Sequence, residues 1–166
     1  SNTIKKDAQR DAFFLLVDSV MQNVLEMKRA GKLKHAMPVR ICGATFGKEN
    51  GIMLPLTEQW GPAEQVALYR ALDDCAGGST PDHIALDLLR QAMERSPSRD
   101  DQKIHRAVLV FADGGSDDAV LVREELQKFR EKGIPVAGFG MTASGRAMEV
   151  VYAPDGKTIE RIEQLP

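Results

Sequence analysis

A continuous apolar run from Ala107 to Ala112 (AVLVFA) constrains the fold more than any other feature of the sequence. Such a run is typical of a strand that is covered on both faces, as in parallel sheets. A second apolar run at 134–140 (IPVAGFG) follows a helix-like segment at 117–133. Because helices alternate with apolar strands, the sequence predicts an α/β fold with a doubly wound, mostly parallel sheet and helices on both faces.

The remaining segments continue this alternation. We expect helices at 4–30, 61–75 and 81–96, strands at 39–46 and 148–152, and an edge strand at 51–58, where Pro55 lacks a donor. The apolar face predicted for the first helix consists of Phe13, Leu16, Val17, Val20, Val24 and Met27. The face predicted for the helix that begins at Pro81 consists of Ile84, Leu88, Leu89 and Met93.

Length and composition narrow the class of protein. The 166 residues, 43% hydrophobic and 28% charged, fit a single domain over 1–166. A net charge of −2 argues against a nucleic-acid partner bound by a basic face. No apolar run approaches the roughly 18 residues of a membrane span. Cys42 and Cys75 have no metal-type spacing, so we expect reduced thiols and a cytoplasmic location.

Two loops carry the candidate site. Asp113 is the first polar residue after the apolar run at 107–112. Thr80 directly precedes the helix predicted at 81–96. In parallel sheets, ligands bind beyond the carboxyl ends of the strands, where both loops are expected. A carboxylate and a hydroxyl suit a hard cation such as Mg²⁺. The alternatives are a helix cap for Thr80 and a turn for Asp113, and Asp117 and Asp118 are expected to cap the following helix.

These loops support a resemblance. The segments VLVFADGGSDD and KGIPVAGFGM, with GGSTPDHIAL before them, resemble the von Willebrand factor A (VWA) family over about residues 4–152. The resemblance implies a doubly wound parallel sheet and a metal-ion-dependent adhesion site, usually for Mg²⁺. It implies that Thr80 and Asp113 are metal ligands. It also implies a protein partner whose acidic side chain completes the metal shell.

The sequence departs from the family in one respect. The family's central first strand ends in an Asp-x-Ser-x-Ser loop, and this motif occurs nowhere in the 166 residues. Asp18 and Ser19 have the wrong spacing and lie within the first predicted helix. The first strand, which would be central in the sheet, is therefore absent from this sequence, and we expect the domain to be incomplete at its N-terminus.

The sequence thus predicts a non-catalytic protein-interaction module with a divalent-metal site, resembling the intracellular adaptors of chelatase and ATPase assemblies. One alternative is a metal-free binding module with a degenerate site. A Mg²⁺-dependent phosphoryl-transfer enzyme is less favoured, because no second carboxylate lies two residues after Asp113 and no P-loop is present.

Overall fold

The computed structural model describes residues 2–32, 39–74, 78–96, 104–112, 115–140 and 151–152. Its helices are α1 (Asn2–Arg29), α2 (Pro62–Asp74), α3 (Asp82–Arg95) and α4 (Ala119–Glu131). Its strands are β1 (Ile41–Thr45), β2 (Gly51–Thr57), β3 (Val108–Ala112) and β4 (Val136–Gly140). The predicted mixture of helices and strands is confirmed, and each of these elements lies within two residues of its predicted bounds.

Local chemistry explains where two of the helices end. Gly31 and Gly133 adopt positive φ angles of 63° and 66°, a conformation that glycine adopts without steric cost. After α1, the Lys32 N–H donates to the Met27 carbonyl at 3.0 Å, and the Gly31 N–H donates to the Lys28 carbonyl at 3.1 Å. This pair of bonds is a Schellman motif, which satisfies carbonyl groups that the helix leaves without partners.

The described strands form two separate sheets rather than one. β1 and β2 pair antiparallel, with Ile41 opposite Thr57, and β3 and β4 pair parallel, with Val108 opposite Val136. Each described strand therefore pairs with one other described strand. The parallel pairing of β3 and β4 matches the prediction, whereas a single doubly wound sheet is not observed among the described residues.

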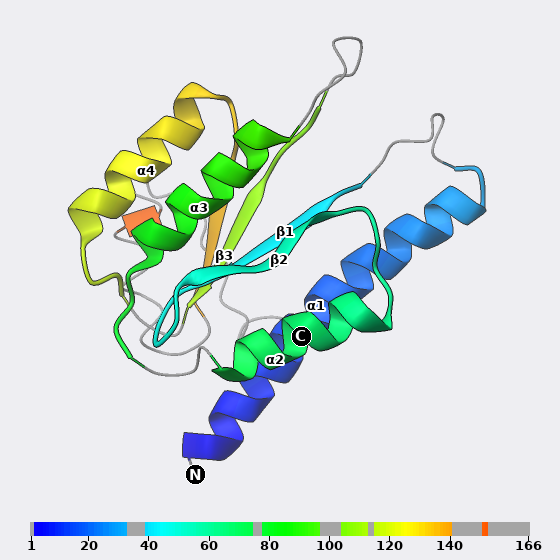
Figure 1. The fold of residues 1–166 in the computed structure, drawn as a ribbon, viewed down its shortest axis with the longest axis horizontal. Coiled ribbons are helices and arrows are strands. Elements are labelled where there is room, and N and C mark those ends of the chain that lie inside the picture. The colour runs from blue at the N-terminus through cyan, green and yellow to red at the C-terminus, as the bar shows by residue number, and fades with distance from the viewer. Residues whose placement is uncertain are drawn as a thin grey trace.

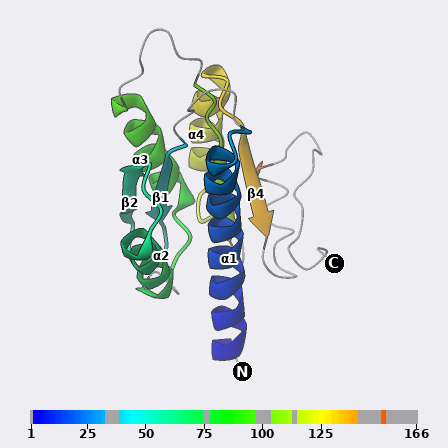
Figure 2. The same ribbon diagram turned by 90° about the vertical axis from the view of Figure 1, so that its right-hand side faces the viewer.

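The elements are arranged in three layers (Figure 1). α3 and α4 lie on one side of the strands, and α1 and α2 lie on the other, as the view turned by 90° also shows (Figure 2). Each helical layer encloses a core. One buried cluster joins α3 and α4 to β3 through Leu86, Val108, Val110, Val122, Leu126 and Phe129, among others. A second joins α1 and α2 to the β1–β2 pair through Met21, Leu54, Trp60 and Leu68.

Coverage of β3 is more one-sided than predicted. Val108, Val110 and Ala112 are buried against α3 and α4, but the Leu109 side chain on the opposite face is 52% exposed. The next residue on that face, Phe111, contacts Phe13 of α1 at 4.5 Å between ring centroids. The prediction of a strand covered on both faces is thus wrong at Leu109, because α1 reaches one end of this face and leaves the other open.

The buried faces of two helices differ in part from the predicted ones. In α1, Phe13 and Val17 pack against the core as predicted, but Met21 is buried and Val20 is half-exposed, so the core-facing stripe is shifted toward Phe14 and Leu25. In α3, Leu89 and Met93 pack against the core as predicted, but Ile84 is 39% exposed and Leu86 is 1% exposed. The buried face of α3 begins at Asp82. Because this residue is charged, the spacing of apolar residues alone does not identify the face.

The predicted strand at 148–152 is wrong where the structure describes it. Val151 and Tyr152 are helical, and residues 148–150 lie outside the described residues. Val151 is buried in the cluster with β3 and α4, so this short turn contributes to the core without adding a strand there.

In the described part of the chain, no helix is both long enough and apolar enough to cross a membrane.

Candidate metal centre

Three loops meet at the end of β3 where α3 and α4 begin. The Thr80 N–H donates to Oδ2 of Asp117 at 2.7 Å, and the Asp117 N–H donates to the Thr80 carbonyl at 3.0 Å. These reciprocal bonds hold the loop before α3 against the loop before α4. The turn after β1 lies beside them, because a Cβ placed on Gly78 would be 2.9 Å from the Lys48 nitrogen.

Gly78 therefore meets two constraints, and its substitution should be costly. Its φ angle is 90°, and the Lys48 backbone occupies the space that a side chain would need. We expect Gly78→Ala to lower the free energy of unfolding by about 1–3 kcal/mol. Gly133→Ala is the matched control, because Gly133 has φ of 66° but no atom within 4 Å of its Cβ position. Chemical denaturation of both variants measures the two losses of unfolding free energy, and we expect the larger loss for Gly78→Ala. Equal losses would show that the contact with Lys48 is unimportant.

The two predicted ligands have different outcomes. Thr80 is half-buried and directly precedes Pro81, and its backbone is fixed by Asp117. Asp113 lies outside the described residues, although Ala112, the residue before it, is the last residue of β3. The structure thus places the loop of Thr80 beside residues 115–118. It describes no geometry between Thr80 and Asp113, so the predicted pair of ligands stays a prediction.

The predicted helix caps are partly wrong. Asp118 caps α4 as predicted, since its carboxylate accepts the Val120 and Leu121 N–H groups, each at 3.0 Å. Asp117 does not cap α4, because its carboxylate accepts the Thr80 N–H instead. At α3, Pro81 occupies the N-cap position, and no side chain caps this helix. Thr80 therefore does not have the capping role that the sequence suggests as an alternative.

A buried polar cluster beside these loops was not predicted. Asp82, the first residue of α3, is only 2% exposed. Its Oδ1 accepts a hydrogen bond from Oγ of Ser116 at 2.5 Å, and its Oδ2 accepts one from the Tyr152 hydroxyl. Ser116 also accepts the Asp118 N–H at 3.2 Å. The cluster thus joins α3, the loop before α4 and the turn at 151–152.

The charges of this cluster follow from its surroundings. Burial raises the pKa of the Tyr152 phenol far above its ordinary value, and the nearby Asp82 carboxylate raises it further. The phenol therefore remains protonated and can donate its hydrogen to Asp82. No described lysine, arginine or histidine pairs with Asp82. The positive end of the α3 dipole lies at this residue and favours a negative charge there.

A further residue considered in the sequence, Asp18, has a structural role. Asp18, in the segment with the wrong spacing for the adhesion motif, lies within α1 as predicted. Its Oδ1 accepts hydrogen bonds from Nε1 of Trp60 at 2.8 Å and from Nε2 of Gln65 at 2.9 Å. Trp60 is buried, so it covers the core between α1 and α2. Cys42 is a half-buried free thiol, and Cys75 lies outside the described residues.

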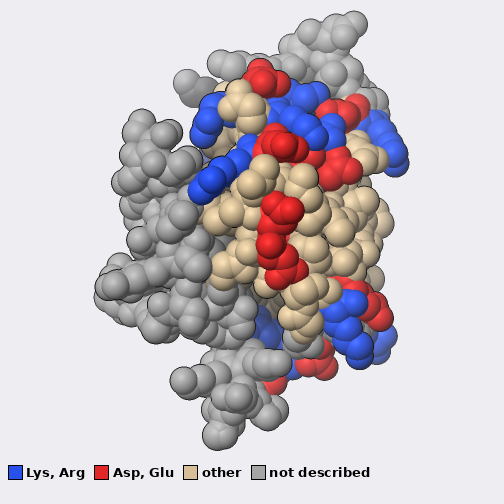
Figure 3. Space-filling view, turned by 90° about the vertical axis from the view of Figure 1, so that its left-hand side faces the viewer, with Lys and Arg blue, Asp and Glu red and all other residues tan. Residues whose placement is uncertain are grey.

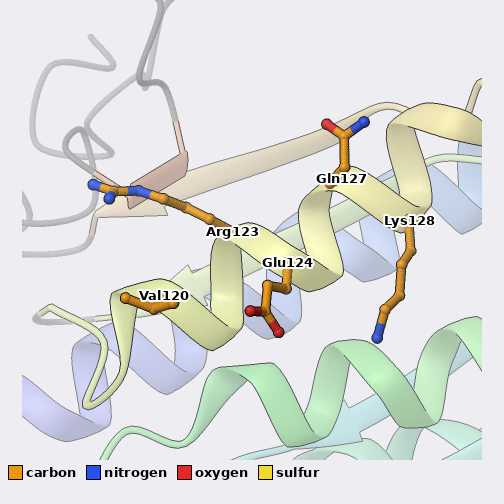
Figure 4. Close-up of a pocket in the computed structure, with 5 residues that line it drawn as sticks. All are labelled: Val120, Arg123, Glu124, Gln127 and Lys128. Atoms are coloured by element: carbon orange, nitrogen blue, oxygen red, sulfur yellow. The ribbon is translucent and has the colours of Figure 1, made fainter.

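A shallow hollow of about 540 Å³ lies over α4 (Figure 4). The described residues that line it all belong to α4: Val120, Arg123, Glu124, Gln127 and Lys128. Glu124 and Lys128 point toward α3, whereas Gln127 points away from it (Figure 4). Four of the five side chains are polar, and the hollow includes neither Thr80 nor any residue of the Asp82 cluster.

Among the described residues, no group of three or more histidine, cysteine, aspartate or glutamate side chains is placed to hold a metal ion. Thr80 contributes a hydroxyl rather than one of these groups, so a cation there needs further oxygen ligands. No family model matches the chain, and the search of curated proteins returned no match.

Proposed function

We propose that the chain is a non-catalytic protein-interaction module that binds a divalent cation, Mg²⁺ in the first instance, with Thr80 and Asp113 as ligands. The observation that carries this proposal is the reciprocal bonding of Thr80 and Asp117. It fixes the Thr80 loop beside the segment that follows β3, which is the arrangement that a shared cation requires. Oxygen ligands from separate loops suit Mg²⁺, which retains several waters in protein sites.

Two ligands make an incomplete site, and the remaining positions point to a partner. In the VWA family, which the sequence resembles, an acidic side chain of the partner completes the metal shell. Acidic and basic side chains are interspersed on the face formed by α3 and α4 (Figure 3). This mixture favours a protein partner over the continuous basic surface that a nucleic-acid backbone selects. We therefore propose an adaptor role within a larger assembly of the chelatase or ATPase type.

The finer fold is also a proposal: the two sheets are parts of one doubly wound sheet, with a further strand between β1 and β3. Side-chain packing links the two sheets on both sides. Phe46, which follows β1, packs against the buried cluster that contains β3. Phe13 of α1 packs against the β1–β2 cluster and contacts Phe111 of β3. An edge strand presents unpaired N–H and C=O groups, which a further strand would satisfy.

Calorimetric titration with Mg²⁺ of the protein as its gene encodes it tests the metal site. We expect saturable binding and a rise in the melting temperature. Asp113→Asn and Thr80→Ala should each lower the affinity by at least about tenfold, or about 1.4 kcal/mol. Ser79→Ala, which removes a neighbouring hydroxyl, should leave the affinity unchanged.

Absence of any response to Mg²⁺, Mn²⁺ or Ca²⁺ would refute the metal site and favour the metal-free binding module. Turnover of a generic phosphate ester that disappears in Asp113→Asn would instead favour the phosphoryl-transfer alternative.

A further inference from the structure

The buried Asp82 cluster is a feature of this chain that the proposed metal site does not itself use. A carboxylate that is 2% exposed and lacks a described cationic partner needs strong hydrogen bonds to remain in the interior. Here both of its oxygens accept hydroxyl groups, one from Ser116 and one from Tyr152. The donors come from segments 36 residues apart in the chain, so Asp82 connects two segments that the backbone does not connect closely.

This cluster is adjacent to the two loops in both sequence and space. Asp82 follows Thr80 by two residues, and Ser116 immediately precedes Asp117. Ser116 also accepts the N–H of Asp118, the residue that caps α4. The bonds between Thr80 and Asp117 and the bonds around Asp82 are therefore two parallel links between the same loops. A change in one link is expected to move the other, since both links join the residues that lead into α3 to the residues that lead into α4.

We infer that Asp82, Ser116 and Tyr152 form a positioning unit that sets the cation affinity of the candidate site through the Thr80 and 115–118 loops. The inference rests on the proposed metal site for its functional consequence. None of the three residues needs to touch the cation. The Tyr152 hydroxyl holds the Asp82 carboxylate, the carboxylate holds Ser116, and Ser116 holds the start of α4. Direct hydrogen-bond partners of metal ligands typically change metal affinity by about 10–100-fold when they are removed, and because this unit acts through Asp117 and Asp118 we expect the lower end of that range.

The geometry also predicts reciprocal coupling. If the Tyr152 hydroxyl strengthens cation binding, then the bound cation must strengthen docking of the turn at 151–152 by the same factor. The turn is anchored by Val151, which is buried in the core cluster, so loss of the Tyr152 hydroxyl alone should leave the turn folded. Tyr152→Phe is therefore the informative variant, because it removes one oxygen and keeps the ring.

The experiment has two readouts on the natural protein and on Tyr152→Phe, with Ser116→Ala as a second variant. Tyr69→Phe is the matched control. The Tyr69 hydroxyl donates to Asp11 at an exposed position, and neither residue belongs to the Asp82 cluster or to the two loops. Hydrogen exchange without metal measures the loops, and calorimetry with Mg²⁺ measures the site. We expect the Thr80 and Asp117 amides to exchange about tenfold faster in Tyr152→Phe, with α2 amides unchanged, and the Mg²⁺ affinity to fall about tenfold.

The outcomes separate the inference from the proposed function. If the natural protein binds Mg²⁺ and neither variant changes the affinity, the inference is wrong and the metal site stands. If exchange accelerates equally in α2 and in the loops, the cluster stabilises the whole domain and has no positioning role. If the natural protein binds no cation, the proposed site fails, and the inferred effect on affinity fails with it.

Discussion

Phe129→Ala should lower the free energy of unfolding by about 3–5 kcal/mol, the range found for removal of a large aromatic side chain from a close-packed core. Phe129 is 0% exposed and lies near the end of α4. It belongs to the cluster that contains Leu86 of α3 and Val108 of β3, so its ring contributes to the packing of three elements. Its carbonyl also accepts the Ile134 N–H at 3.0 Å, in the turn that leads into β4.

Equilibrium denaturation by urea provides the measurement. Phe129→Leu is the matched control, because it keeps an apolar side chain of related volume and should cost less than half as much. Gln127→Ala, on the exposed face of the same helix, should lie within about 0.5 kcal/mol of the natural protein. A loss below about 1 kcal/mol for Phe129→Ala would mean that the cluster is not closely packed around this ring.

The mixture of helices and strands was predictable because local sequence patterns determine it. The runs that became β3 and β4 are short and apolar, and the segments between them have helical spacing, so their identity needs no knowledge of distant contacts. Strand pairing is different, because it depends on which distant segments meet. The sequence therefore predicted β1 to β4 at the right places, but not the strand at 148–152, whose described residues 151 and 152 are helical. It did not establish how β1 and β3 relate to each other.

The site was predictable only to the level of its loops. The glycine-rich segments identified both loops, and the structure brings the segment at 78–81 beside the segment at 115–118. The role of Asp117 could not be predicted, because a carboxylate before a helix usually caps that helix. Here the Asp118 carboxylate makes the capping bonds, which leaves Asp117 to accept the Thr80 N–H.

Asp82 shows why a buried polar residue escapes a search for apolar patterns. Asp82, Ala85, Leu86 and Leu89 are spaced three and four residues apart. All four therefore lie on the face of α3 that packs against the core. A charged residue on such a stripe normally indicates that the stripe is exposed. The two hydroxyl donors that make its burial possible come from Ser116 and Tyr152, and a local reading of α3 includes neither residue.

Arg90→Met should lower the free energy of unfolding by about 1.5–3 kcal/mol, because it removes a charged donor from a buried acceptor. Glu125 of α4 is 8% exposed, and Nε of Arg90 on α3 donates to its Oε2 at 3.2 Å. Lys128 donates to the other oxygen, Oε1, at 2.5 Å. Since Lys128 is half-exposed and remains in the variant, the expected loss is smaller than that for a completely unpaired buried charge.

A double-mutant cycle with Glu125→Met separates two quantities. One is the interaction free energy between Arg90 and Glu125, and the other is the cost of leaving one of them without its charged partner. The attraction between two charges in a protein interior offsets only part of the free energy lost when they leave water. The double variant Arg90→Met/Glu125→Met should therefore be closer in stability to the natural protein than Arg90→Met alone. Lys132→Met is the control for an exposed ion pair: Lys132 donates to Glu94 at 2.5 Å, both groups are exposed, and the loss should be smaller than that of Arg90→Met. If the double variant is instead as unstable as the sum of the two single variants, Arg90 and Glu125 act independently. The Arg90–Glu125 pair would then contribute nothing of its own to the contact between α3 and α4.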